Sequence, residues 1–294
     1  MPNHFTHASV LAFSLLASGA LAQEAVLFAP IPETADLTPT VADAIARIRS
    51  EPLTADVRIV ELDSAAFGSE IMTFDTGLEK FGAMTFNSPD LQALDGGAIP
   101  DDFRDFSWAG RTVADDAESI IYVDPDGSVS GTVFSDDGSY EIRPVAGGLH
   151  AIIEIDDGAI PPEHPEGQLP FEEGGLAPDP VPDSDTAAVD TVDILIAFTT
   201  EAAARYPNVR AQANLIIASA NRVYQRTGIA TRVSLAEAAI VAYDESDSMR
   251  TDLSRLRKTS DGHLDGLHDL RDDTSADLVH LIVDREDFCG LAYV

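Results

Sequence analysis

The sequence predicts two structural units, an α+β domain that contains an antiparallel meander and, after it, a smaller α/β unit. The meander is indicated by strand-like runs that are separated by Asp-Gly and Gly-Gly pairs, at 119–123, 128–134, 139–143 and 149–155. Such pairs supply the positive φ angles of tight hairpin turns. The α/β unit is indicated by a change of pattern late in the chain, where apolar runs of strand length alternate with helical periodicity.

Length and charge limit the classes of partner. The chain has 294 residues, which is enough for two domains of ordinary size. It carries 51 acidic and 18 basic residues, a formal charge of −33. Binding to nucleic acid or to an anionic membrane surface requires clustered Lys and Arg, so we predict neither partner. Nothing in the sequence indicates an oligomeric state.

Residues 1–22 are predicted to be a secretory signal peptide. Val10–Leu16 is a short apolar run, and Ala20-Leu21-Ala22 offers the small residues that signal peptidase prefers, so cleavage is expected after Ala22. A buried N-terminal helix is the alternative. No segment reaches about 18 uninterrupted apolar residues. We therefore expect a secreted or periplasmic protein without membrane contact after signal cleavage.

The first domain is predicted over residues 23–157. It opens with a helix within 38–50, which Thr38 or Thr40 is placed to cap. One face of this helix carries the apolar side chains of Val41, Ile45 and Ile48. Strand-like runs follow at 56–62 and 80–86, before the meander.

A linker is predicted over residues 158–190. This stretch holds seven prolines among acidic residues and glycines, at positions 161, 162, 165, 170, 178, 180 and 182. Proline density and repulsion between like charges favour an extended chain.

The α/β unit is predicted over residues 191–294. Nearly continuous apolar runs indicate buried strands at 191–199 and 276–284, and 229–243 is typical of one or two further strands. A long helix is indicated by helical spacing of Val209, Ala213, Ile216, Ala220, Val223 and Tyr224, with Gly228 just past its end. Carboxylates that flank the strands are interpreted as caps and edge charges: Asp193, Asp277 and Asp284. The last strand-like piece is "CGLAYV".

Sequence motifs for catalysis are absent. The seven histidines form no H-E-x-x-H, which would place two imidazoles on one helical face beside a glutamate; they are His4, His7, His150, His164, His263, His268 and His280. There is no G-x-S-x-G and no zinc-binding cysteine framework, since Cys289 is the only cysteine. In an exported protein a single cysteine pairs between chains, stays reactive or has lost its partner.

Several segments resemble one family in collinear order. "VDILIAFTTEAAARYP", "ANRVYQRTGI", "DGHLDGLHDLRDDTSADLVHLIVD" and "FCGLAYV" are similar to the first half of the catalytic domain of reprolysin-like metzincin zinc endopeptidases, of the peptidyl-Asp metalloendopeptidase type. The matching residues include Phe198-Thr199, Asn221, Tyr224, Leu270-Arg271-Asp272, Cys289-Gly290 and Ala292-Tyr293. "DFSWAGRT" and "GTVFSDDGSYEIRPVAGGLHAIIEID" resemble the propeptide of this group. The resemblance covers residues from about 100 to 294.

The resemblance implies a fold and a function. The first domain would be a propeptide, and the second the incomplete N-terminal subdomain of a metzincin-like catalytic domain. The family binds catalytic zinc through H-E-x-x-H-x-x-G-x-x-H, whose glutamate is the base. This sequence ends before that motif, so no residue here inherits a catalytic or metal-binding role, and zinc is expected only in the intact family member. A helix missing from the sheet would leave an exposed apolar face.

The resemblance also assigns a site. Gly290, Leu291, Ala292 and Tyr293 correspond to the edge strand that binds the substrate backbone, and Cys289 to a cysteine that pairs with one further downstream. We therefore expect a secreted precursor of a zinc-dependent metalloendopeptidase that hydrolyses peptide bonds in peptides or proteins, truncated before its zinc site and inactive as given. The alternatives are a noncatalytic exported binding or inhibitory module derived from a protease, and an unrelated acidic two-domain binding protein.

Overall fold

The structure is a computed structural model that describes most of the chain outside its N-terminus and the proline-rich segment. The described residues are 24–32, 37–69, 71–78, 83–93, 104–112, 117–136, 138–161, 190–285 and 287–292. The predicted signal peptide and residues 162–189 of the predicted linker lie outside them. None of the helices in the described part of the chain is long and apolar enough to cross a membrane.

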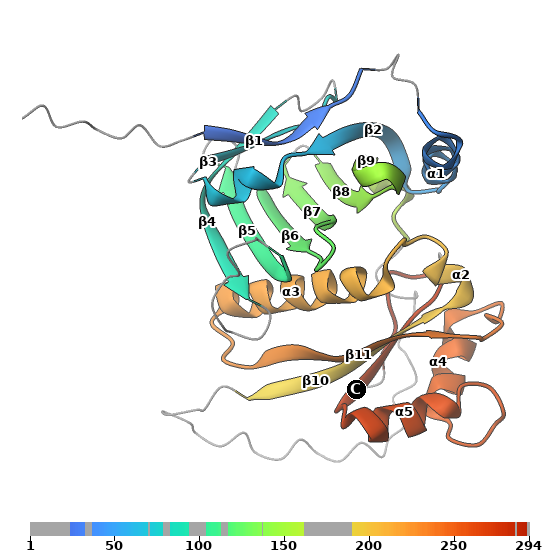
Figure 1. Cartoon of the computed structure of the whole chain (residues 1–294). Coiled ribbons are helices and arrows are strands. Elements are labelled where there is room, and N and C mark those ends of the chain that lie inside the picture. The colour runs from blue at the N-terminus through green and yellow to red at the C-terminus, as the bar shows by residue number, and fades with distance from the viewer. Residues whose placement is uncertain are drawn as a thin grey trace, which may run out of the picture.

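The described residues of the first unit form a closed β-barrel (Figure 1). The strands follow the order β1-β2-β9-β8-β7-β6-β5-β4-β3, and β1 closes the barrel by pairing in parallel with β3. Their bounds are β1 Glu24–Pro30, β2 Thr54–Leu62, β3 Ile71–Asp75, β4 Ala83–Ala93, β5 Phe106–Thr112, β6 Glu118–Val123, β7 Val129–Ser135, β8 Gly138–Pro144 and β9 Leu149–Ile155.

Aromatic side chains fill the barrel. Phe74 lies at the centre of this group, with ring centroids 5.2 Å from Phe28, 4.5 Å from Phe86 and 5.6 Å from Trp108. All four side chains are almost completely buried. Because period-2 alternation sends every second side chain of a strand inward, closing the sheet gathers these rings into one core.

Helix α1 (Pro39–Arg49) covers the outside of the barrel. Its first turn is capped by Thr38, whose Oγ1 accepts a hydrogen bond from the Val41 N–H at 3.4 Å. The predicted apolar face is buried against β2 and β9, through Val41, Ile45 and Ile48. The predicted helix, one of its two candidate caps and its buried face are thus confirmed.

The first unit is mostly β, so the predicted α+β class is wrong for it. The four meander strands are present as β6 to β9 and pair antiparallel with their neighbours. Three strands that the sequence pattern did not indicate, β1, β3 and β5, turn this meander into a barrel. Within the described residues of this unit, α1 and three short 3₁₀ turns are the helical elements: η1 Ser64–Gly68, η2 Ala146–Gly148 and η3 Asp157–Ala159.

The second unit contains a parallel sheet of three strands within its described residues, in the order β11-β10-β12. The strands are β10 Thr191–Thr199, β11 Arg232–Val241 and β12 Leu278–Ile282. The helices are α2 Thr200–Ala203, α3 Val209–Thr227, α4 Met249–Arg257 and α5 Gly266–Thr274. Gly228 ends α3 with a left-handed φ of 75°, as the sequence predicts.

Both faces of the central strand β10 are covered. Ile196 and Phe198 pack against α3, while Leu195 and Ala197 pack in a cluster with residues of α4 and α5. The expected exposed apolar face is therefore not found on β10. Large exposed apolar side chains of this sheet lie on the outer strands, at Ile240 and Leu278.

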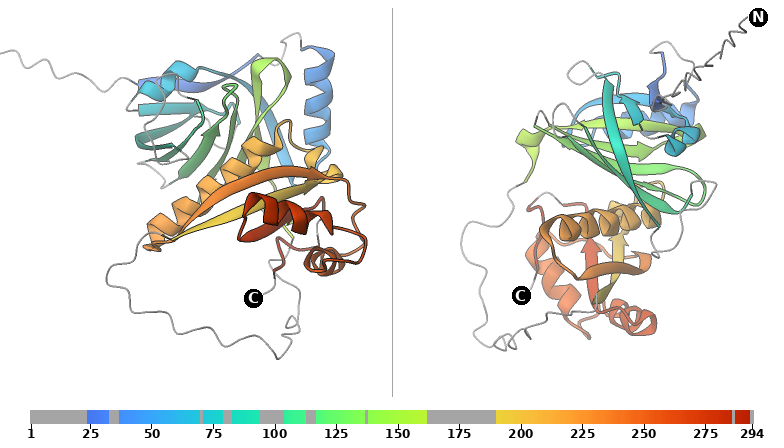
Figure 2. Two further views of the ribbon diagram at one scale, coloured as in Figure 1. Left: turned by 60° about the horizontal axis from the view of Figure 1, so that its bottom comes forward. Right: turned by 90° about the vertical axis from the view of Figure 1, so that its left-hand side faces the viewer.

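Helix α3 lies between this sheet and the barrel (Figures 1 and 2). Its sheet side contributes Ala213 and Ile217 to one cluster. Its barrel side contributes three residues to a second cluster with β5 and β6, namely Ala211, Leu215 and Ala218. The helix is thus shared by the two units.

Candidate functional site

The predicted peptide-binding residues lie at the end of the described chain. Cys289, Gly290 and Ala292 are exposed, Leu291 is half-buried, and Tyr293 lies outside the described residues. Residues 289–292 do not form the expected strand. The Cys289 Sγ donates a hydrogen bond to the carbonyl oxygen of Pro161 at 3.1 Å. Their role in substrate binding and the disulfide of Cys289 remain predictions.

Arg285 holds the segment before these residues against the loop that follows β11. Its Nη1 donates to the Ser246 carbonyl at 2.8 Å and its Nη2 to the Asp247 carbonyl at 2.7 Å. The same guanidinium pairs with Asp287 at 3.0 Å. Five donors in a rigid fork allow one Arg to join several acceptors. The chain after β12 is therefore tied to the chain after β11.

Asp287 also ties the chain after β12 to the start of α4. Its Oδ2 accepts a hydrogen bond from the Met249 N–H at the start of α4, at 3.1 Å. Partial burial works against the charge of Asp287, but the Met249 N–H and the Arg285 guanidinium outweigh it and lower the pKa of this carboxyl. Asp287 is thus ionised at neutral pH.

Glu245 joins the carboxyl ends of the parallel strands. Its Oε1 accepts from the Thr199 hydroxyl at 2.5 Å, at the end of β10, and from the Asp284 N–H at 2.7 Å, just after β12. Glu245 itself follows β11. In open α/β sheets ligands bind outside the carboxyl ends of the strands. Glu245 therefore fixes the edge at which residues 284–292 leave the sheet.

Asp252 of α4 binds two residues of the loop that follows β11. Its buried carboxylate accepts from the Tyr243 hydroxyl at 2.5 Å and from the Ser246 N–H at 2.9 Å. Arg255 donates to the Tyr243 hydroxyl at 3.0 Å. Burial and the neighbouring Asp252 raise the pKa of Tyr243, which stays protonated as the donor.

Sequence reasoning found the strand-end aspartates but not this network. Asp193 and Asp277 cap each other, since each backbone N–H donates to the other residue, at 2.9 and 2.8 Å. Asp284 forms an ion pair with Arg205. Glu245, Asp252 and Arg285 were not singled out, although the acidic run "YDESDS" just after the predicted strand was a signal for such a site.

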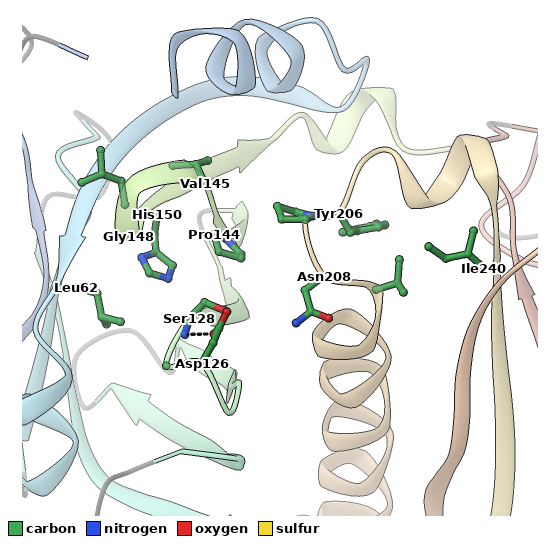
Figure 3. Close-up of a pocket in the computed structure, with 14 residues that line it drawn as sticks. Leu62, Asp126, Ser128, Pro144, Val145, Gly148, His150, Tyr206, Asn208 and Ile240 are labelled. Atoms are coloured by element: carbon green, nitrogen blue, oxygen red, sulfur yellow. Dashed lines mark hydrogen bonds between the residues drawn. The ribbon is translucent and has the colours of Figure 1, made fainter. Parts of the chain in front are cut away.

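A cavity of about 610 Å³ lies between the end of the barrel and the turn before α3 (Figure 3). Its lining includes Leu62, Asp126 and His150 of the barrel, and Tyr206 and Asn208 of the second unit. His150 is almost completely buried, and its Nε2 accepts from the Val129 N–H at 3.0 Å. The ring is therefore neutral with its proton on Nδ1, and burial lowers the pKa of His150 to about 4.

Comparison with known proteins shows sequence similarity to one group of metallopeptidases. Residues 210–294 match the family described as metallo-peptidase family M12B, reprolysin-like. The peptidyl-Asp metalloendopeptidase of Stenotrophomonas maltophilia is 29% identical over 288 residues, which cover 94% of this chain and 68% of that protein. This chain is similar to the reprolysin-like metallopeptidases.

A second relative extends the same similarity. The peptidyl-Asp metalloendopeptidase of Xanthomonas campestris is 26% identical over 275 residues, 88% of this chain and 64% of that protein. The similarity to the two peptidyl-Asp metalloendopeptidases thus runs through both the barrel and the α/β unit, and this chain spans about two thirds of their length. No solved structure shows a significant match.

Intact reprolysin-like metallopeptidases use zinc, but the histidines at positions 150, 263 and 268 of the described chain lie in other contacts. His150 faces the barrel, His268 bonds to the Lys258 carbonyl at 3.0 Å, and the ring of His263 packs against Tyr243. In the described ranges no group of three or more His, Cys, Asp or Glu side chains could hold a metal ion. The described residues therefore do not fit a catalytic zinc ion.

Proposed function

We propose that this chain is the prepropeptide and the N-terminal part of the catalytic domain of a secreted zinc-dependent endopeptidase. The observation that carries the proposal is the similarity to two peptidyl-Asp metalloendopeptidases along 94% and 88% of the chain, through both units. In this scheme residues 1–22 are the signal peptide, 23–157 the propeptide, 158–190 the linker and 191–294 the start of the catalytic domain. The substrate is a peptide or protein.

The segment 290–293 is proposed to bind the backbone of an extended substrate. Gly290 and Ala292 are exposed, and no atom lies within 4 Å of the position of a Cβ on Gly290. An exposed backbone segment can accept a peptide as an added strand. The ties of Arg285 and Asp287 to the neighbouring loop support this role, because they hold the start of the segment beside the strand ends.

Zinc is proposed to bind outside the described residues. A catalytic site of this class needs three protein ligands and an open position for water, and the described residues bring no such group together. The relatives are longer than this chain, which covers 68% and 64% of them. We therefore expect the described residues alone to hydrolyse no peptide.

One experiment separates an enzyme precursor from a noncatalytic binding or inhibitory module. The whole reading frame that begins at Met1 and residues 1–294 alone are each expressed with export. Zinc per chain is measured by mass spectrometry, and peptide hydrolysis is measured with and without a chelator. The proposal predicts one zinc ion and chelator-sensitive hydrolysis in the whole frame, and neither in residues 1–294.

Two outcomes would contradict the proposal. A whole reading frame that binds no zinc and hydrolyses no peptide would favour the noncatalytic module. An exported product that still begins at Met1, as read by N-terminal sequencing, would remove the predicted cleavage after Ala22.

A further inference from the structure

Strand β6 of the barrel is buried on both faces. Its inward side chains Ile121 and Val123 belong to the barrel core. Its outward side chains Ile120 and Tyr122 are only 5% and 1% exposed, and they pack against α3. The outward face of a barrel strand ordinarily meets water and is polar. An apolar outward face therefore belongs to a contact surface, here with α3.

Strand β6 runs antiparallel to helix α3, and its outward residues contact α3 from one end to the other. Glu118 pairs with Arg222 and Arg226 near the C-terminus of α3, and Asp124, just after β6, contacts Asn208 at its N-terminus. The apolar contact lies between these two polar ends and joins Ala109, Ile120 and Tyr122 to Ala211, Leu215 and Ala218. The match extends over the full length of both elements.

Charges at one end of the contact are complementary. Helix α3 contains Arg210, Arg222 and Arg226 and no acidic residue, although the chain as a whole has a charge of −33. Glu118 places Oε1 3.0 Å from the Nε of Arg222, and its Oε2 pairs with Arg226. The Glu118 side chain is 12% exposed. Charge pairs of this kind fix register and partner choice more than raw affinity.

At the N-terminal end of α3, the residue that caps the helix also contacts the barrel. Asn208 caps α3, because its Oδ1 accepts from the Arg210 and Ala211 N–H groups at 3.0 and 3.2 Å. The same amide donates from Nδ2 to Asp124 at 2.5 Å. The barrel therefore orients the residue that caps α3.

We propose that the outward face of β6 is a specific docking surface for helix α3, so that the barrel and the α/β unit recognise each other as two separate molecules once the chain between them is cut. This surface consists of Glu118, Ile120, Tyr122 and Asp124. The proposal concerns association and does not rest on the proposed catalytic function.

The test uses the full chain with a recognition sequence for a site-specific protease inserted between Gly174 and Gly175. After complete cleavage, size-exclusion chromatography with light scattering is expected to show both fragments at the mass of the uncut chain. Glu118→Lys should raise the dissociation constant about tenfold or more, because it opposes two arginines with a cation. The triple variant Glu118→Lys, Arg222→Glu, Arg226→Glu should restore pairing. Asp43→Lys, an exposed charge reversal on α1, is the matched control.

Separation of the unmodified fragments after cleavage, or a Glu118→Lys sample that stays paired as tightly, would overturn the proposal. A variant that leaves the barrel unchanged guards against misfolding at β6. The double variant Arg222→Glu, Arg226→Glu alters only α3. The side chains of Arg222 and Arg226 are 20% and 49% exposed. The double variant should release the barrel as a folded, monodisperse fragment, and continued pairing of this variant would contradict the docking surface equally.

Discussion

Glu118 on β6 lies 3.0 Å from the Nε of Arg222 on α3, although 104 residues separate the two in the chain. The contact joins a barrel strand to the helix that also covers the parallel sheet. A change at this pair therefore acts on a helix that both units share. The stability of the intact chain and the pairing of its two units are linked at this point.

Glu118→Gln is expected to lower the free energy of unfolding of the intact chain by about 1–2 kcal/mol, because the amide keeps the shape but loses the charge that holds two arginines. Urea denaturation measures the change. A double-mutant cycle with Arg222→Met should give a coupling energy near 1 kcal/mol. Asp43→Asn on the exposed face of α1 serves as the control and should stay within about 0.5 kcal/mol. A coupling energy near zero would mean that the pair adds nothing to stability.

Gly110 is expected to tolerate no side chain. A Cβ built there would lie 2.1 Å from Cη2 of Trp108, which is fully buried and packed between Phe74 and Phe86. The indole cannot move without disturbing these rings, so Gly110→Ala should cost about 1–3 kcal/mol in thermal or urea unfolding. Gly266→Ala on α5 meets no atom within 4 Å and should be neutral or slightly stabilising. Equal effects of the two changes would argue against this packing of the barrel.

The sequence predicted what local pattern determines. The helix 39–49 and its face, the four meander strands and the alternation of 191–282 follow from periodicity and turn residues that lie close together in the chain. The closure of the barrel depends instead on the parallel pairing of β1 with β3, for which the two segments carry no shared signal. Propensity alone therefore predicted a meander, and tertiary pairing made it a barrel.

Helix α3 shows the same division. The predicted apolar face of α3 packs against the sheet through Ala213, Val209, Ile216 and Ala220. Val223, which was predicted on the same face, is 55% exposed. The second buried face of α3 packs against a barrel strand about 90 residues earlier in the chain. The periodicity of the α3 sequence alone does not predict this contact. A signal did exist in "ESIIYV", because a continuous apolar run indicates a strand that is buried on both faces. The polar network at the strand ends likewise joins Arg285 to a loop 39 residues earlier.

Arg285→Met is expected to loosen the segment that leads to the predicted peptide-binding residues. The substitution keeps the apolar stem and removes the bonds to the Ser246 and Asp247 carbonyls. Amide hydrogen exchange over 284–292 should accelerate about tenfold or more, while exchange in the barrel stays unchanged. Arg111→Met, at an exposed position on β5, is a matched control for loss of a guanidinium. Unchanged exchange in 284–292 would mean that Arg285 does not hold this segment.

His150 is expected to make stability depend on pH below neutrality. Its pKa is about 4 in the folded chain because of burial, against 6.5 for the unperturbed group. The unfolded chain therefore binds the proton more readily between these values, and stability falls as pH falls from 6.5 towards 4. From pH 7 to pH 5 the loss from this residue should be about 2 kcal/mol.

The comparison with His150→Gln isolates this effect from the titration of carboxylates. Gln cannot titrate, and its amide oxygen is placed to accept the Val129 N–H that now bonds to Nε2. Urea unfolding at pH 7 and pH 5 should therefore show a smaller loss for the variant, by about 2 kcal/mol. If both proteins lose the same stability, His150 is not held neutral by burial. A greater loss of stability in His150→Gln would mean that the pKa of His150 is raised on folding, by a group that stabilises the charged ring.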